Sequence, residues 1–101
     1  MEDKVLVIHL TATTVPMIGK ATDDCVDGVQ ILRVEDPLWM VYYRDDEGEE
    51  RMQLTNVTAY AKEDVIAIDR SHIVYMYEPK DFILGYYNDT MTKRLEPVTN
   101  D

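Results

Sequence analysis

The sequence contains few of the residues that build disulfide-linked, metal-bound or membrane-spanning proteins. Its 101 residues include one cysteine, Cys25, so an internal disulfide is excluded. Cys25, His9 and His72 are scattered without the spacing of zinc ligands, so we expect no metal and no cofactor. No apolar run approaches membrane-spanning length, and residues 5–10 do not resemble a signal peptide. We therefore expect a soluble cytoplasmic protein without a membrane partner.

Positive charge is also scarce. Ten Lys and Arg residues stand against twenty Asp and Glu residues, which gives a formal net charge of −10. Such a surface repels phosphate backbones, so an extended interface with duplex nucleic acid is not expected. A small site remains compatible with this charge if arginine, polar groups and stacking surfaces hold one or two single-stranded nucleotides. The same charge suits an acidic module that binds a basic protein partner.

The motifs of common enzymes are absent as well. The sequence has no glycine-rich phosphate loop and no elbow around a nucleophilic serine. Its acidic residues cluster in turns, and no pair of them lies in the apolar surroundings that would raise a carboxyl pKa for acid–base chemistry. We predict that the protein is not an enzyme.

The sequence does contain a succession of β-strand patterns, and its length suits one domain with one modest core. Apolar and β-branched residues predict strands over residues 5–10, 29–34, 38–44 and 52–60. The first strand ends or bends near Pro16, residues 23–28 form a polar break, and Pro37 separates the second strand from the third. The acidic segment 45–50 is predicted to be the tip of a hairpin between the last two strands.

Residues 65–79 read as two further short strands folded back on each other around a tip at residues 69–72. Apolar side chains occupy both faces of the second strand, which therefore needs cover on both sides. In a chain of this length, the pattern predicts a small closed barrel or contact with a neighbouring subunit.

The character of the chain changes after Pro79. Residues 81–87 are apolar and aromatic and must be covered, either as an added strand or as a short helix packed on the barrel. Polar residues dominate from Asn88 onward. We therefore expect one β-barrel domain over residues 1–88 and a loose tail over residues 89–101.

Residues 68–76 match a motif that runs Ile-Arg-Gly, two variable polar residues, Val or Ile, a variable residue, Tyr or Phe, then Ile, except that Asp69 and Arg70 replace Arg-Gly. Residues 49–54 match Asp, a variable residue, an aromatic or His, Met, Asn, then Leu, with Arg51 at the base-stacking position and Gln53 for the Asn that reads the base edge. The motif at residues 49–54 precedes the motif at residues 68–76, and in this order the two resemble the first and second motifs of the Sm-like family of RNA-binding ring proteins. The resemblance covers about residues 28–79.

The resemblance implies an all-β fold, a small, strongly bent antiparallel β barrel of the Sm-like or SH3-like type, here with an extra C-terminal segment. It also implies a closed homo-oligomeric ring, in this family usually a hexamer or heptamer, formed by edge strands of neighbouring subunits. The expected subunit interface contains Ile73, Tyr75 and Tyr77. The implied function is non-catalytic binding of single-stranded RNA, or DNA, in nucleic-acid processing or chaperoning. The expected binding residues at the pore are Arg51, Gln53, Arg70, Ser71 and His72.

A plainer interpretation of the same residues stays open. Arg51 and Arg70 can be solvated turn residues, Gln53 a polar residue on the outer face of a strand, and His72 an exposed turn histidine. The seven tyrosines suit a barrel wall as well as an interface. On this interpretation the protein is an acidic protein-interaction or assembly module that does not bind nucleic acid.

Overall fold

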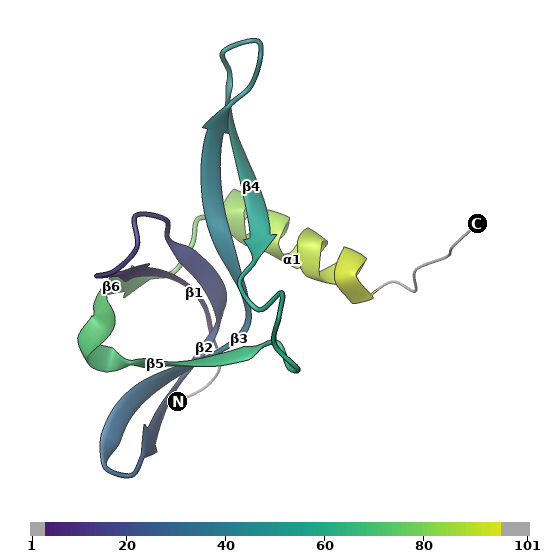
Figure 1. The fold of residues 1–101 in the computed structure, drawn as a ribbon. Helices are drawn as coiled ribbons and strands as arrows, with labels where there is room; N and C mark the ends of the chain where they lie inside the picture. The colour runs from purple at the N-terminus through teal and green to yellow at the C-terminus, as the bar shows by residue number, and fades with distance from the viewer. Residues whose placement is uncertain (1–3, 96–101) are drawn as a thin grey trace.

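The computed structural model describes the backbone of residues 4–95 and the side chains of residues 4–93. Six strands, a short 3₁₀ helix and one α-helix follow one another along the chain (Figure 1). They are β1 (Lys4–Leu10), β2 (Met17–Val26), β3 (Val29–Arg44), β4 (Glu50–Asn56), β5 (Val65–Asp69), η1 (Arg70–His72), β6 (Ile73–Tyr77) and α1 (Asp81–Leu95). The predicted all-β fold with an extra C-terminal segment is confirmed.

The strands form one strongly bent antiparallel sheet. The strand order is β4-β3-β2-β1-β6, and β5 pairs with the first half of β3. Because β5 continues through η1 into β6, the two ends of the sheet approach each other and enclose a small barrel (Figure 1). Its interior is filled by buried apolar side chains from the first three strands, namely Ile8, Met17, Ala21, Leu32 and Val34.

The third strand is longer than the sequence suggested. Residues 29–34 and 38–44 were expected to be separate strands divided at Pro37, but β3 runs through both. Asp36 takes a positive φ of 51° at the junction, which bends the strand without ending it. The first half of β3 lies in the barrel wall, and its second half extends beyond the barrel as a hairpin with β4 (Figure 1).

Strand β2 takes up most of the polar break that was predicted over residues 23–28. Residues 23–26 belong to β2 and pair with the start of β3, so only Asp27 and Gly28 form the turn. Both turn residues have positive φ values, 50° and 81°, which is the pattern of a two-residue type I′ hairpin turn. Strand pairing with β3 over nine residue pairs outweighs the low β propensity of the aspartates.

The hairpin predicted over residues 65–79 is wrong in its pairing. Both strands and the turn between them exist, but β5 pairs with β3 and β6 pairs with β1. The three residues of η1 carry the chain from one end of the sheet to the other, so the two strands diverge instead of folding back on each other. Closing the barrel covers the inner face of the two strands, whereas Val74, Tyr75 and Tyr77 of β6 stay exposed, so the predicted cover on both faces is not present within the described part of one chain.

The segment after Pro79 is a helix of 15 residues that crosses the second half of β3. Ile83 and Tyr87, one turn apart, pack on Leu38 and Met40. The fully buried Tyr87 hydroxyl donates a hydrogen bond of 2.9 Å to the carbonyl of Asp36, which ties the helix to the bend in β3. The helix continues beyond residue 88, where a loose tail was expected to begin; residues 96–101 lie outside the described part.

Candidate functional site

The hairpin of β3 and β4 has one face covered by the helix and one face left open. Residues directly opposite each other in an antiparallel pair share a face. Met40 pairs with Leu54 and both pack beneath α1. The neighbouring pairs point to the other side. We call that surface the open face, and it consists of Trp39, Val41 and Tyr43 on β3 with Thr55, Gln53 and Arg51 opposite them on β4.

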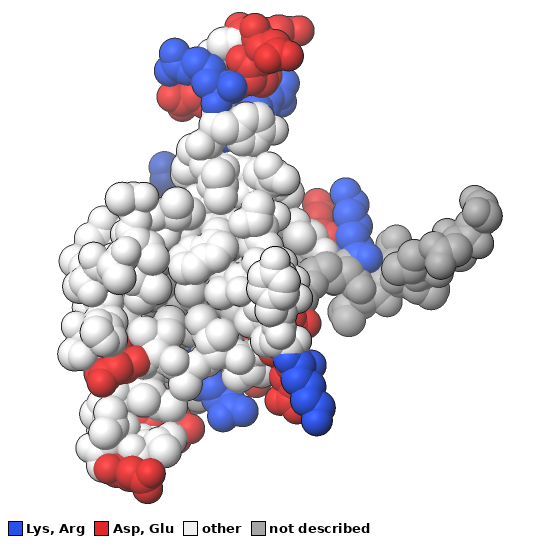
Figure 2. Space-filling model, viewed as in Figure 1, with Lys and Arg blue, Asp and Glu red and all other residues white. Residues whose placement is uncertain are grey.

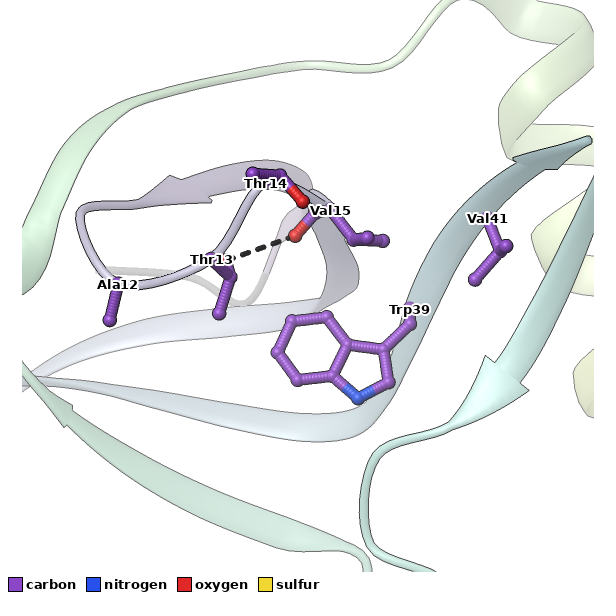
Figure 3. Close-up of a pocket in the computed structure, with 6 residues that line it drawn as sticks. All are labelled: Ala12, Thr13, Thr14, Val15, Trp39 and Val41. Atoms are coloured by element: carbon purple, nitrogen blue, oxygen red, sulfur yellow. Dashed lines mark hydrogen bonds between the residues drawn. The ribbon is translucent and has the colours of Figure 1, made fainter.

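The open face begins at a depression beside Trp39. Its volume is about 430 Å³, and it lies between the β1–β2 loop and the second half of β3 (Figure 3). The indole ring forms one wall, and Thr13 and Val15 lie across from it. The loop holds its own shape because the Thr13 hydroxyl donates a hydrogen bond of 3.1 Å to the carbonyl of Val15. Because Ala12, Val15, Trp39 and Val41 line it, the depression is mostly apolar, and the indole ring gives it one flat aromatic surface.

Beyond the depression, the open face carries a polar group and an aromatic group that a ligand can reach, Gln53 in the middle and Tyr43 at the far end. Gln53 is exposed, and its amide makes no hydrogen bond to any residue within the described range. Tyr43 keeps 48% of its surface exposed at the far end of the face. Because alternate residues of a strand are about 6.7 Å apart, Trp39 and Tyr43 are separated by about 13 Å with Gln53 between them.

Arg51 ends the open face at the hairpin tip, where acidic residues neutralise it. Its Nε atom donates to Asp45 Oδ2 at 3.0 Å, and its Nη2 atom lies 3.6 Å from Glu49 Oε2. The hydrogen bond from Arg51, followed by one from the backbone N–H of Glu49, lowers the pKa of Asp45. Figure 2 shows both charge signs gathered at this tip, whereas the middle of the visible face is formed by uncharged residues.

The other predicted binding residues lie elsewhere. Arg70, Ser71 and His72 form η1, and Arg70 makes an ion pair with Asp23 on β2. Arg51 pairs with Tyr43, whereas η1 follows Asp69, which pairs with Ile31. The two groups thus attach to β3 at positions twelve residues apart. Within one chain the structure does not bring Arg51 and Gln53 together with Arg70, Ser71 and His72.

The predicted interface residues divide in a similar way. Ile73 is half-buried and packs against the barrel interior. Tyr75 and Tyr77 are about half exposed and stack with His9, whose Nε2 lies 2.9 Å from the Tyr77 hydroxyl. Burial, and then the neighbouring Tyr75 and Tyr42, raise the pKa of Tyr77. The tyrosines therefore form an aromatic surface on the outer side of β6, and Ile73 belongs to the core.

A comparison with models of known protein families gives no match, and neither does a comparison with curated proteins. The geometry of the chain itself therefore carries the functional argument.

Other kinds of site find no support within the described residues. No group of three or more His, Cys, Asp or Glu side chains between residues 4 and 93 is placed to hold a metal ion. Cys25 is an exposed free thiol. Along the described backbone, no helix combines the length and the apolar character needed to cross a membrane.

The sequence interpretation missed Trp39 and gave Tyr43 no role in binding. A signal was present, because residues 38–43 are apolar at every position and such a strand needs cover on two faces. Which face would stay open depended on where the helix packs, and that packing was not visible in the pattern.

Proposed function

We propose that this protein binds single-stranded nucleic acid, RNA or DNA, without catalysing a reaction, and that the open face of the β3–β4 hairpin is the binding surface. One observation carries the proposal: the half-exposed ring of Tyr43, the partly buried ring of Trp39, a free amide and a guanidinium share one surface that the helix leaves uncovered. Bases stack on exposed aromatic rings with little regard to sequence. The Gln53 amide can donate to and accept from a base edge, and Arg51 can contact a phosphate.

The scarcity of positive charge determines what kind of binding this face can support. Arg51 is the one cation among the six residues of the open face, and it is already paired with acidic residues. Stacking therefore supplies most of the binding free energy, and the release of counterions supplies little. For one neutralised phosphate, the logarithm of the affinity falls by only about 0.7 per tenfold increase in salt.

We further propose that the protein acts as a homo-oligomeric ring. Within the described residues, β4 pairs only with β3 and β6 pairs only with β1, so each has one edge without a strand partner. The β4 edge of one copy can pair with the β6 edge of the next, and Tyr75 and Tyr77 lie next to that contact. Such head-to-tail contacts close into a ring when the rotation permits. Repeated open faces would raise the effective concentration of a weak site.

The binding proposal is tested by fluorescence anisotropy with a labelled oligo(U) strand. Tyr43→Ala removes one stacking ring and should weaken binding by about fivefold or more, because stacking contributes about 1–3 kcal/mol per base. Tyr60→Ala is the matched control, because Tyr60 is fully exposed on the connector after β4 and lies outside the open face. Equal affinities for the two variants would refute the site, and no binding by the unmodified protein would refute the function.

A second candidate function is supported by a separate observation. Five of the nine cationic side chains that the structure describes form an ion pair with an acidic side chain, namely Lys4, Lys20, Arg44, Arg51 and Arg70. An acidic assembly module that binds a basic protein partner would have this surface. It would ignore oligo(U) in the anisotropy measurement and would bind an oligolysine peptide with a steep dependence on salt.

A further inference from the structure

The tip of the β3–β4 hairpin holds Arg51 between two carboxylates that differ in how firmly they are fixed. Asp45 Oδ1 accepts hydrogen bonds from the backbone N–H groups of Glu47, at 3.0 Å, and Glu49, at 2.9 Å. Its other oxygen, Oδ2, accepts from Arg51 Nε. Gly48, at φ 80°, and a backbone bond from its N–H to the Asp45 carbonyl close the same turn. Asp45 is therefore a built-in part of the turn.

The contact with Glu49 is of a different kind. Its carboxylate has no other hydrogen bond within the described residues, and its side chain is 67% exposed. It lies 3.6 Å from Nη2, one of the two terminal nitrogens of the Arg51 guanidinium, whereas Asp45 contacts Nε. Exposed pairs of this geometry are weak and exchange readily. Glu49 can therefore leave Arg51 while Asp45 keeps the guanidinium in place.

We propose that Glu49 is an autoinhibitory counter-ion, which occupies the part of Arg51 that a phosphate group of a bound strand would take. The inference rests on the function proposed above and adds its regulation. In the free protein the charge of Arg51 is neutralised by two carboxylates, through Nε and Nη2, so the side chain attracts a phosphate without a stacking base only weakly. A strand whose bases stack on Tyr43 and Trp39 holds its phosphate beside Arg51 long enough to displace Glu49. The contact thus makes the open face select for unpaired bases over phosphate alone.

The test compares two variants that change the charge equally. Glu49→Gln removes the counter-ion, and Glu47→Gln removes the same charge from the same tip, where only the backbone of Glu47 bonds to Asp45. At low salt, oligo(U) should bind the Glu49 variant about two- to fivefold more tightly than the Glu47 variant, as an exposed ion pair allows. The advantage should disappear when Arg51→Ala is added to both. Equal affinities of the two glutamine variants, or an advantage that persists without Arg51, would overturn the proposal.

A second readout does not depend on nucleic-acid binding. Titration of inorganic phosphate, followed by the NMR signal of the Arg51 Nε–H group, should show saturation at lower phosphate in the Glu49 variant than in the Glu47 variant. If the two titrations coincide, the autoinhibitory contact is refuted even when no oligonucleotide binds. If they differ and oligo(U) fails to bind the unmodified protein, the counter-ion is supported and the proposed function is refuted.

Discussion

Asp69 controls the short turn that joins the two halves of the barrel wall. It precedes η1 with an extended backbone, and its Oδ1 atom accepts a hydrogen bond of 2.9 Å from the N–H of Ser71. Hydrogen bonds from the backbone and side chain of Ser71, followed by the charge of His72, lower the pKa of Asp69 below its ordinary value of 3.8. The folded protein therefore binds a proton at Asp69 less readily than the unfolded chain does.

The pH dependence of this carboxylate follows from that shift. Asp69 stabilises the fold at pH values above its unfolded pKa, and its contribution is lost as the pH falls through its lower folded pKa. In a carboxyl-detected NMR titration, we expect Asp69 to titrate below 3.8 and its midpoint to rise in Ser71→Ala, which removes the hydroxyl donor. A midpoint at or above 3.8 in the unmodified protein would contradict this account of the turn.

Of the four side chains that the proposed site depends on, the sequence alone pointed to two. Arg51 and Gln53 could be singled out because they stand at chosen positions of a motif. Trp39 and Tyr43 gain their roles only because they are paired across the strands with Thr55 and Arg51, on the face that α1 does not cover. The sequence also placed Arg70 in this site, because it does not show that β5 and β4 pair with different halves of β3. That pairing determines how far Arg70 lies from Arg51.

Among the elements, β2 crosses the bend of β3 at close range. The register shifts between Ile18 and Lys20, and the residue between them is Gly19. A Cβ atom added there would lie 2.5 Å from Val34 Cγ1 and 3.2 Å from Pro37 Cα. The Val34 side chain would have to shift, and the backbone of the bend at Pro37 leaves little space on the same side, so the crossing favours a residue without a side chain.

Replacement of Gly19 should therefore destabilise the fold. We expect Gly19→Ala to lower the free energy of unfolding by about 1–3 kcal/mol, the usual cost of overpacking a core. Gly85→Ala is the control, because a Cβ at this mid-helix position meets nothing within 4 Å. It should raise the free energy of unfolding by about 0.5–1 kcal/mol, since alanine is the better helix former. Urea unfolding of both variants measures the contrast, and a neutral Gly19→Ala would contradict the crossing.

Strand patterns predicted most of the elements but not their partners. The turn at residues 69–72 looked like a hairpin tip because its neighbours in sequence are both strands. The pairing of β5 with β3 and of β6 with β1 depends on contacts between residues 30 or more positions apart. Local propensity says little about such contacts, and the same reason explains why a bent β3 was taken for two strands.

For the whole molecule, the edges of β4 and β6 that have no strand partner among the described residues predict assembly into an oligomer. Light scattering behind a sizing column should give a mass of five or more subunits of 11.7 kDa. Tyr75→Glu together with Tyr77→Glu should reduce that mass by placing charges next to the contact. A monomer over a wide concentration range would refute the ring and would leave the binding site on each chain to be tested separately.

The most direct test of the central claim uses the single tryptophan of the chain, which lies at the start of the open face. Trp39 emission should be quenched when oligo(U) is added, because a stacked base contacts the indole ring. The quenching should saturate at the same oligonucleotide concentration as the anisotropy signal and should change little with salt. Anisotropy that saturates while Trp39 emission stays constant would place the bound strand elsewhere and contradict the account.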